Sequence, residues 1–350
     1  MLDIGKLSPK FLHDIILSRL GANCSELLQG PKFGVDNAVV RVADGTVMVC
    51  TTDPISIIPP IGVDSSAWLS VNLLASDLTT SGFQPAFAIF DLNLPPSLQD
   101  TELEAYWDGI HRACKELSVA IVGGHTGRFV GCDYTIVGGG FMIALGPEER
   151  YLTSTMARTG DVLLLTKGAA IAATGILAHA FPNTVERRLG GKLLKQTQSY
   201  LRKCSTVKDA LTASSVGVRD EGVTAMHDVT EGGVFGGIFE LISASGKGAN
   251  IDKRAIHVAE ETRQICELFG IDPFNALGEG CLVISIRPEK SERVQRALAD
   301  AGIASFTVGE VTDPGSGIFI LDESRRKRLE YPERDTYWEA YWRAVDEGWN

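Results

Sequence analysis

The sequence predicts two domains, of which the first is a layered α/β domain. The chain has 350 residues, and single hydrophobic cores stop growing at about 250–300 residues. In the first half, apolar segments typical of buried strands alternate with segments of helical periodicity, the order found in α/β domains. Around residues 146–160 this pattern loosens into a stretch rich in glycine and charge. We therefore expect an N-terminal domain over 1–150 and a C-terminal domain over 151–350.

Local signals place the elements of the first half. Ser8, Pro9 and Gly21 are typical of the N-cap, the first turn and the end of a helix, and Phe11, Leu12, Ile15, Ile16 and Leu20 form its apolar stripe. Strands are expected at 46–52, 86–92, 119–122 and 133–144, and helices at 65–81 and from residue 100.

The second half also mixes strands with helices. Strands are expected at 162–166, 223–227, 281–286 and 304–310, and helices at 170–180, 192–203, 206–216, 233–246 and 289–301. The tail carries Tyr337, Trp338, Tyr341, Trp342 and Trp349, whose spacing predicts a short amphipathic helix that docks on the body or on a second subunit. The basic run Arg325-Arg326-Lys327-Arg328, flanked by acidic residues, is interpreted as a solvated helix face.

Composition excludes several classes of function. The net charge of −11 argues against a nucleic-acid partner, because an acidic chain repels phosphate backbones. The seven cysteines form no C-x-x-C pair, which favours reduced thiols in a cytoplasmic protein over disulfides or a zinc site. Residues 1–6 show no signal-peptide pattern, and no apolar run reaches the roughly 18 residues of a membrane span.

Asp77 is the most informative single residue. It is the only charged side chain from Ser65 to Phe90 and lies on a strongly apolar helix. A carboxylate in such surroundings needs a partner, and a bound cation is a natural one. The alternative is that it caps a neighbouring loop or points to water. Asp53 lies at a strand end and Asp36 after a glycine loop, positions where carboxylates can bind Mg²⁺. An aspartate in a turn, however, commonly only stabilises the turn.

Two glycine-rich segments are candidates for phosphate binding. Gly123-Gly124-His125-Thr126 directly follows a predicted strand, and Asp228 to Gly233 lies between a strand and a helix. Glycines in such turns allow backbone N–H groups to point at an anion, although a segment of this kind, taken singly, is more often only a tight turn. Gly138-Gly139-Gly140 lies inside a predicted strand and is interpreted as a packing or bulge feature.

Taken in order, these motifs resemble the aminoimidazole-ribonucleotide-synthetase (AIR synthetase) superfamily, which contains thiamine-monophosphate kinase, selenophosphate synthetase and HypE. The similarity is greatest to HypE and spans about residues 5–315. It rests on Gly5-Lys6-Leu7, Gly30-Pro31, Gly34-Val35-Asp36, Thr51-Thr52-Asp53-Pro54, Ser76-Asp77-Leu78, Gly123-Gly124-His125-Thr126, Met226 to Gly233, Gly278-Glu279-Gly280 and Val308-Gly309-Glu310-Val311.

The resemblance implies an α/β N-terminal domain and an α+β C-terminal domain, with two subunits joined through their N-terminal sheets into a shared barrel. It implies ATP in the cleft and Mg²⁺ held by Asp36, Asp53 and Asp77. The nucleotide contacts that it implies are Gly34, Gly123, Gly124, Thr126, Arg128, Asp228, Thr230, Gly232 and Gly233. Such a homodimer would transfer a phosphoryl group to an oxygen of a small-molecule substrate and could meet a maturation partner protein. No catalytic residue is assigned.

The sequence also departs from the HypE pattern. Asn37 stands where many relatives have a second Asp, Gly127 where HypE proteins often carry Lys (with Arg128 adjacent), and Ala172 where relatives often have Glu. HypE ends in a cysteine that carries the carbamoyl group, whereas no cysteine follows Cys281 in this sequence. Three interpretations therefore stay open: a HypE-like enzyme, a kinase resembling thiamine-monophosphate kinase, and a nucleotide-binding scaffold without catalysis.

Overall fold

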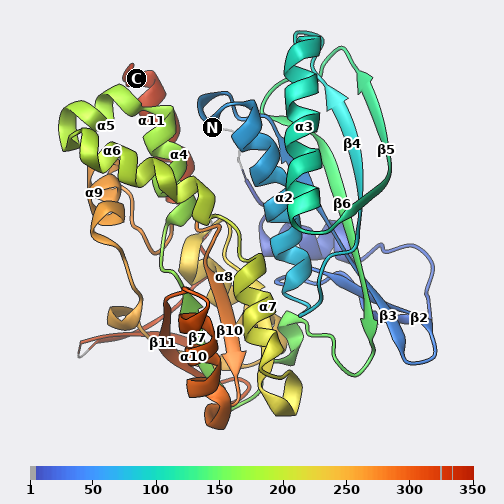
Figure 1. Cartoon of the computed structure of the whole chain (residues 1–350). Helices are drawn as coiled ribbons and strands as arrows, with labels where there is room; N and C mark the ends of the chain where they lie inside the picture. Colours follow the sequence, from blue (N-terminus) through green and yellow to red (C-terminus); the bar gives the residue numbers. More distant parts are fainter. Residues whose placement is uncertain (1–4, 324, 333) are drawn as a thin grey trace.

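The computed structural model describes residues 5–323, 325–332 and 334–350 and contains two mixed sheets, each with its own helices (Figure 1). Residues 1–4, which begin the segment without a signal-peptide pattern, lie outside the described residues. Within the described ranges, no helix is both long enough and apolar enough to span a membrane.

The N-terminal sheet has six strands in the order β1-β2-β3-β6-β4-β5. Its strands are β1 (Leu27–Gln29), β2 (Ala38–Ala43), β3 (Thr46–Ser56), β4 (Phe87–Leu94), β5 (Ala120–Arg128) and β6 (Ile136–Pro147). Only β4 and β5 pair in parallel, and the helix α3 (Asp100–Glu116) connects them. Together with α2 (Val63–Thr79), α3 covers one face of the sheet and forms the first core (Figure 1).

The other face of this sheet is open and apolar. Residues of β4 alternate, so that Ala88 and Phe90 are buried while Phe87 and Ile89 are each 36% exposed. A row of paired residues crosses four strands of this face: Leu27 of β1, Val40 of β2, Met48 of β3 and Leu145 of β6. Apolar surface of this extent is unusual on a monomeric protein and marks an interaction surface.

The C-terminal sheet has seven strands in the order β13-β12-β9-β11-β7-β10-β8. Its strands are β7 (Val162–Thr166), β8 (Val223–Asp228), β9 (Gly248–Asp252), β10 (Leu282–Ile286), β11 (Ser305–Thr312), β12 (Ile318–Asp322) and β13 (Arg325–Arg328). Its helices are α4 (Ile171–Ala180), α5 (Pro182–Leu189), α6 (Gly191–Gln198), α7 (Val207–Ser215), α8 (Gly233–Ser245), α9 (Glu260–Phe269), α10 (Ser291–Asp300) and α11 (Thr336–Asp346). The predicted boundary at residue 150 falls between β6 and β7.

The aromatic tail forms the expected helix. Asp335 caps α11 by accepting a hydrogen bond from the backbone N–H of Tyr337. Tyr337 is 3% exposed, and Tyr341 and Trp349 pack on Phe181. The helix therefore docks on the body of its own subunit.

Two local predictions are wrong. Residues Arg325–Arg328 form the exposed edge strand β13 and not a helix face, because they pair with β12 in a hairpin. The segment Gly123–Thr126 is not a turn, because it continues β5 to Arg128 in register with β4. The elements β1, β2, α5, α9, β9 and β12 have no counterpart in the prediction.

Candidate metal and nucleotide site

Four aspartates from both domains converge where α2, β3 and β8 meet. Asp53 lies on β3, Asp77 near the end of α2 and Asp228 at the end of β8, and the carboxyl groups of Asp77 and Asp228 are hydrogen-bonded. Asp36 completes the group, since one ligand atom each of Asp36, His227 and Asp228 lies within 4.8 Å of the others. The three predicted metal ligands are thus brought together, with Asp228 added from the C-terminal domain.

A close approach between the domains explains why glycine precedes Asp36. Gly34 has a φ of +76°, and a Cβ at this position would lie 2.4 Å from the backbone oxygen of Glu240. Any side chain would therefore push the 34–37 loop away from α8. This contact brings Asp36 to the C-terminal domain, and it gives Gly34 a packing role in the site.

His227 forms a buried bridge between two carboxylates. Its Nδ1 lies 2.6 Å from Oδ1 of Asp36 and its Nε2 lies 2.7 Å from Oε2 of Glu240. Although burial opposes the charged ring, Asp36 and Glu240 raise the pKa of His227 to about 10. The ring therefore carries protons on both nitrogens and does not offer a lone pair to a metal.

Glu240 is the centre of a wider network. Its Oε1 accepts a hydrogen bond of 2.9 Å from the Tyr331 hydroxyl and lies 3.6 Å from Nζ of Lys6. Lys6 also donates from Nζ to Oγ1 of Thr230 at 2.8 Å, and from its backbone N–H to Glu231 at 2.6 Å. Despite burial, Lys6 and His227 lower the pKa of Glu240 to about 2.

The aspartate cluster carries more negative charge than the side chains around it neutralise. Within the described residues, two cationic groups, Lys6 and His227, face the acidic side chains of Asp36, Asp53, Asp77, Asp228 and Glu240. Burial and repulsion by Asp228 raise the pKa of Asp53 to about 7, and burial with the charge of Asp36 raises that of Asp228 to about 6. Burial and the three other aspartates raise the pKa of Asp77 well above its ordinary value.

This donor set fits Mg²⁺. Oδ2 of Asp36 is buried without a hydrogen-bond partner in the described chain, which leaves it free for a cation. The available ligands are all carboxylate oxygens, which is the ligand type that Mg²⁺ prefers. The four aspartates would hold such an ion, and its charge would offset their mutual repulsion.

The second glycine segment borders this cluster. Thr230 contacts Lys6, but the N–H of Gly232 donates to Asp335 at 2.8 Å and that of Gly233 donates to the Thr230 carbonyl at 3.2 Å. A Cβ on Gly233 would lie 2.7 Å from the Phe274 carbonyl oxygen. In this arrangement both glycines serve close packing, and their role in phosphate binding stays a prediction.

The first glycine segment lies elsewhere in the subunit. Gly124 pairs with Phe90, Phe90 with Gly140, and Gly140 with Asp53, so three strand spacings separate Gly124 from Asp53. At about 4.8 Å per spacing this is about 14 Å. Gly123, Gly124 and Thr126 are therefore not brought to the aspartates of their own chain.

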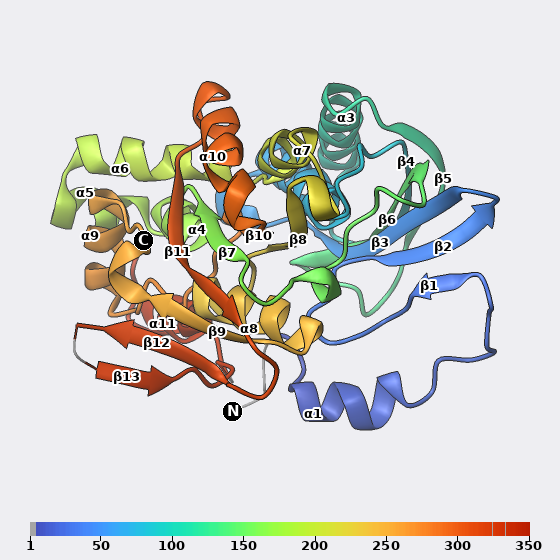
Figure 2. The same ribbon diagram turned by 90° about the horizontal axis from the view of Figure 1, so that it is seen from below.

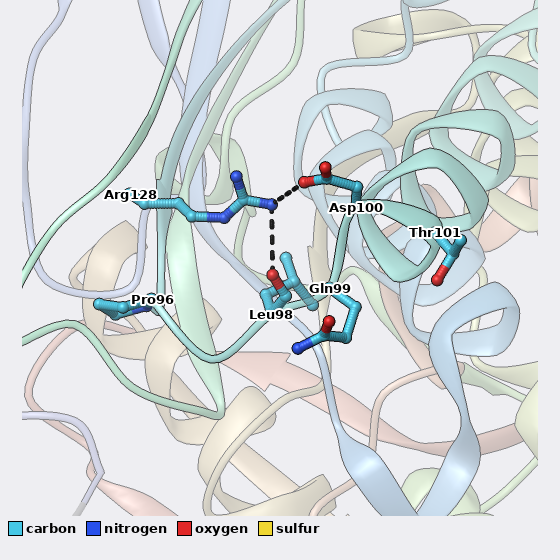
Figure 3. Close-up of a pocket in the computed structure, with 6 residues that line it drawn as sticks. All are labelled: Pro96, Leu98, Gln99, Asp100, Thr101 and Arg128. Carbon is cyan, nitrogen blue, oxygen red and sulfur yellow. Dashed lines mark hydrogen bonds and ion pairs between the residues drawn. The ribbon is translucent and has the colours of Figure 1, made fainter.

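Arg128 is also held away from the aspartates. At the end of β5 its Nη2 lies 2.6 Å from Oδ1 of Asp100 and 3.2 Å from the Leu98 carbonyl oxygen (Figure 3). These residues, with Pro96, Gln99 and Thr101, line a shallow depression of about 360 Å³ at the start of α3. In this position Nη2 of Arg128 serves Asp100 and Leu98, and a role of Arg128 in phosphate binding stays a prediction.

Glu279 is a further buried acid beside the cluster. Its Oε2 has no hydrogen-bond partner in the described chain, and burial raises its pKa well above the ordinary value. Asp228 and Glu231 are among the negative groups that add to this shift. A carboxyl that keeps its proton near a charged site is suited to donate it.

Comparisons with known proteins identify the family of both domains. Residues 34–145 match the model of the N-terminal domain of AIR synthase related proteins, and residues 158–322 match the model of their C-terminal domain. A selenide, water dikinase of Methanococcus maripaludis is 25% identical over 85% of this chain and 90% of its own. A putative hydrogenase expression/formation protein of Methanocaldococcus jannaschii is 23% identical over 95% of both chains. The carbamoyl dehydratase HypE of Rhizobium leguminosarum is 26% identical over 76% of this chain and 73% of its own.

Solved structures show the same fold. Thiamine monophosphate kinase from Aquifex aeolicus superposes with a TM-score of 0.68 at 18% identity, covering 91% of this chain and 97% of that one. A hydrogenase maturation protein HypE in complex with ATP has a TM-score of 0.67 at 18% identity, covering 95% and 97%. The two family models together span most of the sequence, and the chain therefore belongs to the AIR synthase related family of two-domain α/β proteins, whose members include ATP-using enzymes.

Proposed function

We propose that this protein is a Mg²⁺- and ATP-dependent enzyme that transfers a phosphoryl group to an oxygen of a small substrate. The observation that carries the proposal is the convergence of four aspartates from both domains with an excess of negative charge. Phosphoryl transfer depends mostly on positioning and charge neutralisation, and metal ions bound by such carboxylates neutralise the phosphates.

The residues of this chain have separable roles in the proposal. The four aspartates hold the cation, and Lys6, which already lies over the cluster, offers a mobile positive charge to a phosphate oxygen. Glu279 would hold a proton beside the reacting group. The burial of several side chains at this site, such as His227 and Asp228, would help to exclude water from the reaction.

The open apolar face of the N-terminal sheet supports a homodimer. Two such faces would cover each other in the shared barrel that the resemblance implies, and the exposed edge of β5 would find a partner there. In such a dimer the Gly123–Thr126 segment would border the site of the other subunit, which would account for its distance from its own aspartates.

The three alternative functions differ in their substrates. Relatives of this chain are named as selenide, water dikinase, as carbamoyl dehydratase HypE and as thiamine monophosphate kinase. A HypE-like reaction, a kinase reaction on a thiamine-like monophosphate and nucleotide binding without catalysis are therefore three separate outcomes. ATP turnover in the presence of selenide, thiamine monophosphate or a carbamoylated peptide would discriminate among them.

The proposal is tested by ATP binding and hydrolysis with and without Mg²⁺. Asp77→Asn should abolish Mg²⁺-dependent ATP binding in calorimetry while the circular dichroism spectrum stays unchanged. The matched control is Asp108→Asn, which changes an exposed aspartate of α3 and should leave binding intact. Equal ATP affinity of Asp77→Asn and wild type in Mg²⁺ would remove Asp77 from the site. Binding without any ATP turnover, with every substrate tried, would favour the scaffold alternative.

A further inference from the structure

Residues 7–20 form an arm with an unusually exposed apolar side. Ser8 caps the helix α1 (Pro9–Phe11), which continues as a π-helical turn over Leu12–Leu17. The exposed apolar side chains are Leu7 (55%), Phe11 (50%), Ile15 (43%), Ile16 (47%) and Leu20 (52%). The predicted apolar stripe is therefore present, but no core of its own subunit covers it.

The arm makes few contacts with the rest of its subunit. None of the residues from Pro9 to Leu17 is buried. Within the described chain, the side-chain bonds of residues 8–20 join two residues of the same stretch, such as Lys10 with Asp14, Ser18 with the Asp14 carbonyl and Arg19 with the Ile15 carbonyl. A helix this short is marginal in water and takes its stability from packing of its apolar side. The arm therefore needs a covering surface.

Both ends of the arm are fixed, to different domains. At one end Lys6 binds Thr230 and Glu231 of the C-terminal domain. At the other end β1 pairs with β2 at the edge of the N-terminal sheet. Figure 2 shows α1 on the outside of the molecule, on the side of β1. The apolar side of the arm is thus presented at a defined place.

The charge distribution of the arm favours a second copy of this chain as the covering surface. A helix that lies on a membrane has a polar side rich in Lys and Arg. Here Lys10, His13, Asp14 and Arg19 give a mixed polar side, and the net charge of −11 repels anionic lipid. A surface of the same chain that is apolar and uncovered is available: the open face of the N-terminal sheet.

The arm is also continuous with that open face. The chain runs from Leu20 into β1, where Leu27 is 41% exposed and begins the apolar row that crosses to Leu145. A partner seated on the sheet would lie beside the arm at this edge.

We propose that in a homodimer the arm formed by residues 7–20 packs its apolar side on the second subunit. The proposal rests on the dimer of the proposed function and adds a segment to its interface. Because the arm begins directly after Lys6, the partner would also hold that lysine over the aspartate cluster. A second copy would thus help to complete each site.

The test uses the full chain and analytical ultracentrifugation over a concentration series. The double variant Phe11→Glu/Ile15→Glu introduces two glutamates on the apolar side of the arm. The control His13→Glu/Ser18→Glu introduces two glutamates on its polar side. Loss of two apolar anchors should raise the dimer dissociation constant about tenfold or more, whereas the control should match wild type. Circular dichroism and the melting temperature at monomeric concentration confirm that each variant folds.

Three results would overturn the proposal. One is a dimer of unchanged affinity in Phe11→Glu/Ile15→Glu while Leu145→Glu dissociates it, since the sheet would then form the interface without the arm. Another is a wild-type protein that is monomeric at every concentration. The third is that Phe11→Glu/Ile15→Glu loses a wild-type affinity for phosphatidylserine-containing vesicles while its dimer affinity stays unchanged. The arm would then bind a membrane and not a second subunit. The ATP-binding experiment on wild type is separate from all three, so a failure of the arm is distinguishable from a failure of the catalytic proposal.

Discussion

Proton release should accompany Mg²⁺ binding to the aspartate cluster. The cation binds ionised carboxylates, and in the metal-free site the pKa of Asp53 is raised to about 7 and that of Asp228 to about 6. Both groups are therefore partly protonated near neutral pH and must lose these protons when a cation arrives. Because protons compete with the metal, affinity should rise as pH rises through 6 and 7.

The size of the effect follows from these values. When the pH falls from 8 to 6, protonation of a carboxyl of pKa about 7 lowers the Mg²⁺ affinity about tenfold. Protonation of a carboxyl of pKa about 6 lowers it by about another factor of two. Mg²⁺ should thus bind about 20-fold more weakly at pH 6 than at pH 8, and the raised pKa of Asp77 can only increase the difference. The two carboxyls titrate as a coupled set, so the expectation concerns their joint effect.

Calorimetry in two buffers of different ionisation enthalpy measures this directly. The apparent binding enthalpy should depend on the buffer at pH 6.5, and the slope gives the number of protons released. At pH 8.5 the slope should become smaller. Mg²⁺ affinity that is equal at pH 6 and pH 8, with no dependence on buffer, would refute the assignment of a cation to these carboxylates.

The remaining predictions concern His227, the tail helix and the cysteines. His227→Gln removes the charged bridge to Asp36, so Mn²⁺ affinity measured by electron paramagnetic resonance should fall about 10- to 100-fold, while His257→Gln should change nothing. Tyr337→Ala removes a buried ring and should cost about 3–5 kcal/mol of unfolding free energy in denaturant titration, whereas Trp342→Ala, at a side chain that is 48% exposed, should cost far less. None of the seven cysteines should gain a carbamoyl group from a HypF-type donor, because four are buried and reactive thiols need exposure and a lowered pKa; a stable mass gain of one carbamoyl group would contradict this.

Periodicity and end signals were sufficient for elements that pack against a sheet. The strand Val162–Thr166 and the helix α8 agree with the prediction almost to the residue, because a buried strand or helix carries its apolar pattern in its own sequence. The hairpin β12–β13 was missed for the opposite reason. Its outer strand carries four charged side chains and is held by pairing with β12, so nothing in its own pattern favours a strand.

The Gly123–Thr126 segment shows how pairing overrides a turn signal. Two adjacent glycines are typical of turns, yet here they belong to an edge strand. A Cβ on Gly124 would lie 2.3 Å from the Phe90 carbonyl oxygen, so close contact with β4 is what requires glycine at that position. Gly124 therefore has an explanation in strand packing, whereas a Cβ on Gly123 would meet no atom closer than 3.9 Å. A role of this segment in phosphate binding stays a prediction.

Glu240 is predictable on the same ground as Asp77, because each is a single charge in an apolar helix. In α8 Glu240 is the only charged side chain of thirteen residues, most of which are apolar. A buried carboxylate of this kind requires a cationic partner, and the structure supplies His227 and Lys6. Which cations those are could not be predicted, since His227 meets Glu240 only when β8 packs against α8, and Lys6 only when the N-terminal segment crosses to the C-terminal domain. A charge that stands alone in an apolar element thus predicts that a site exists, whereas the identity of its partners depends on the tertiary fold.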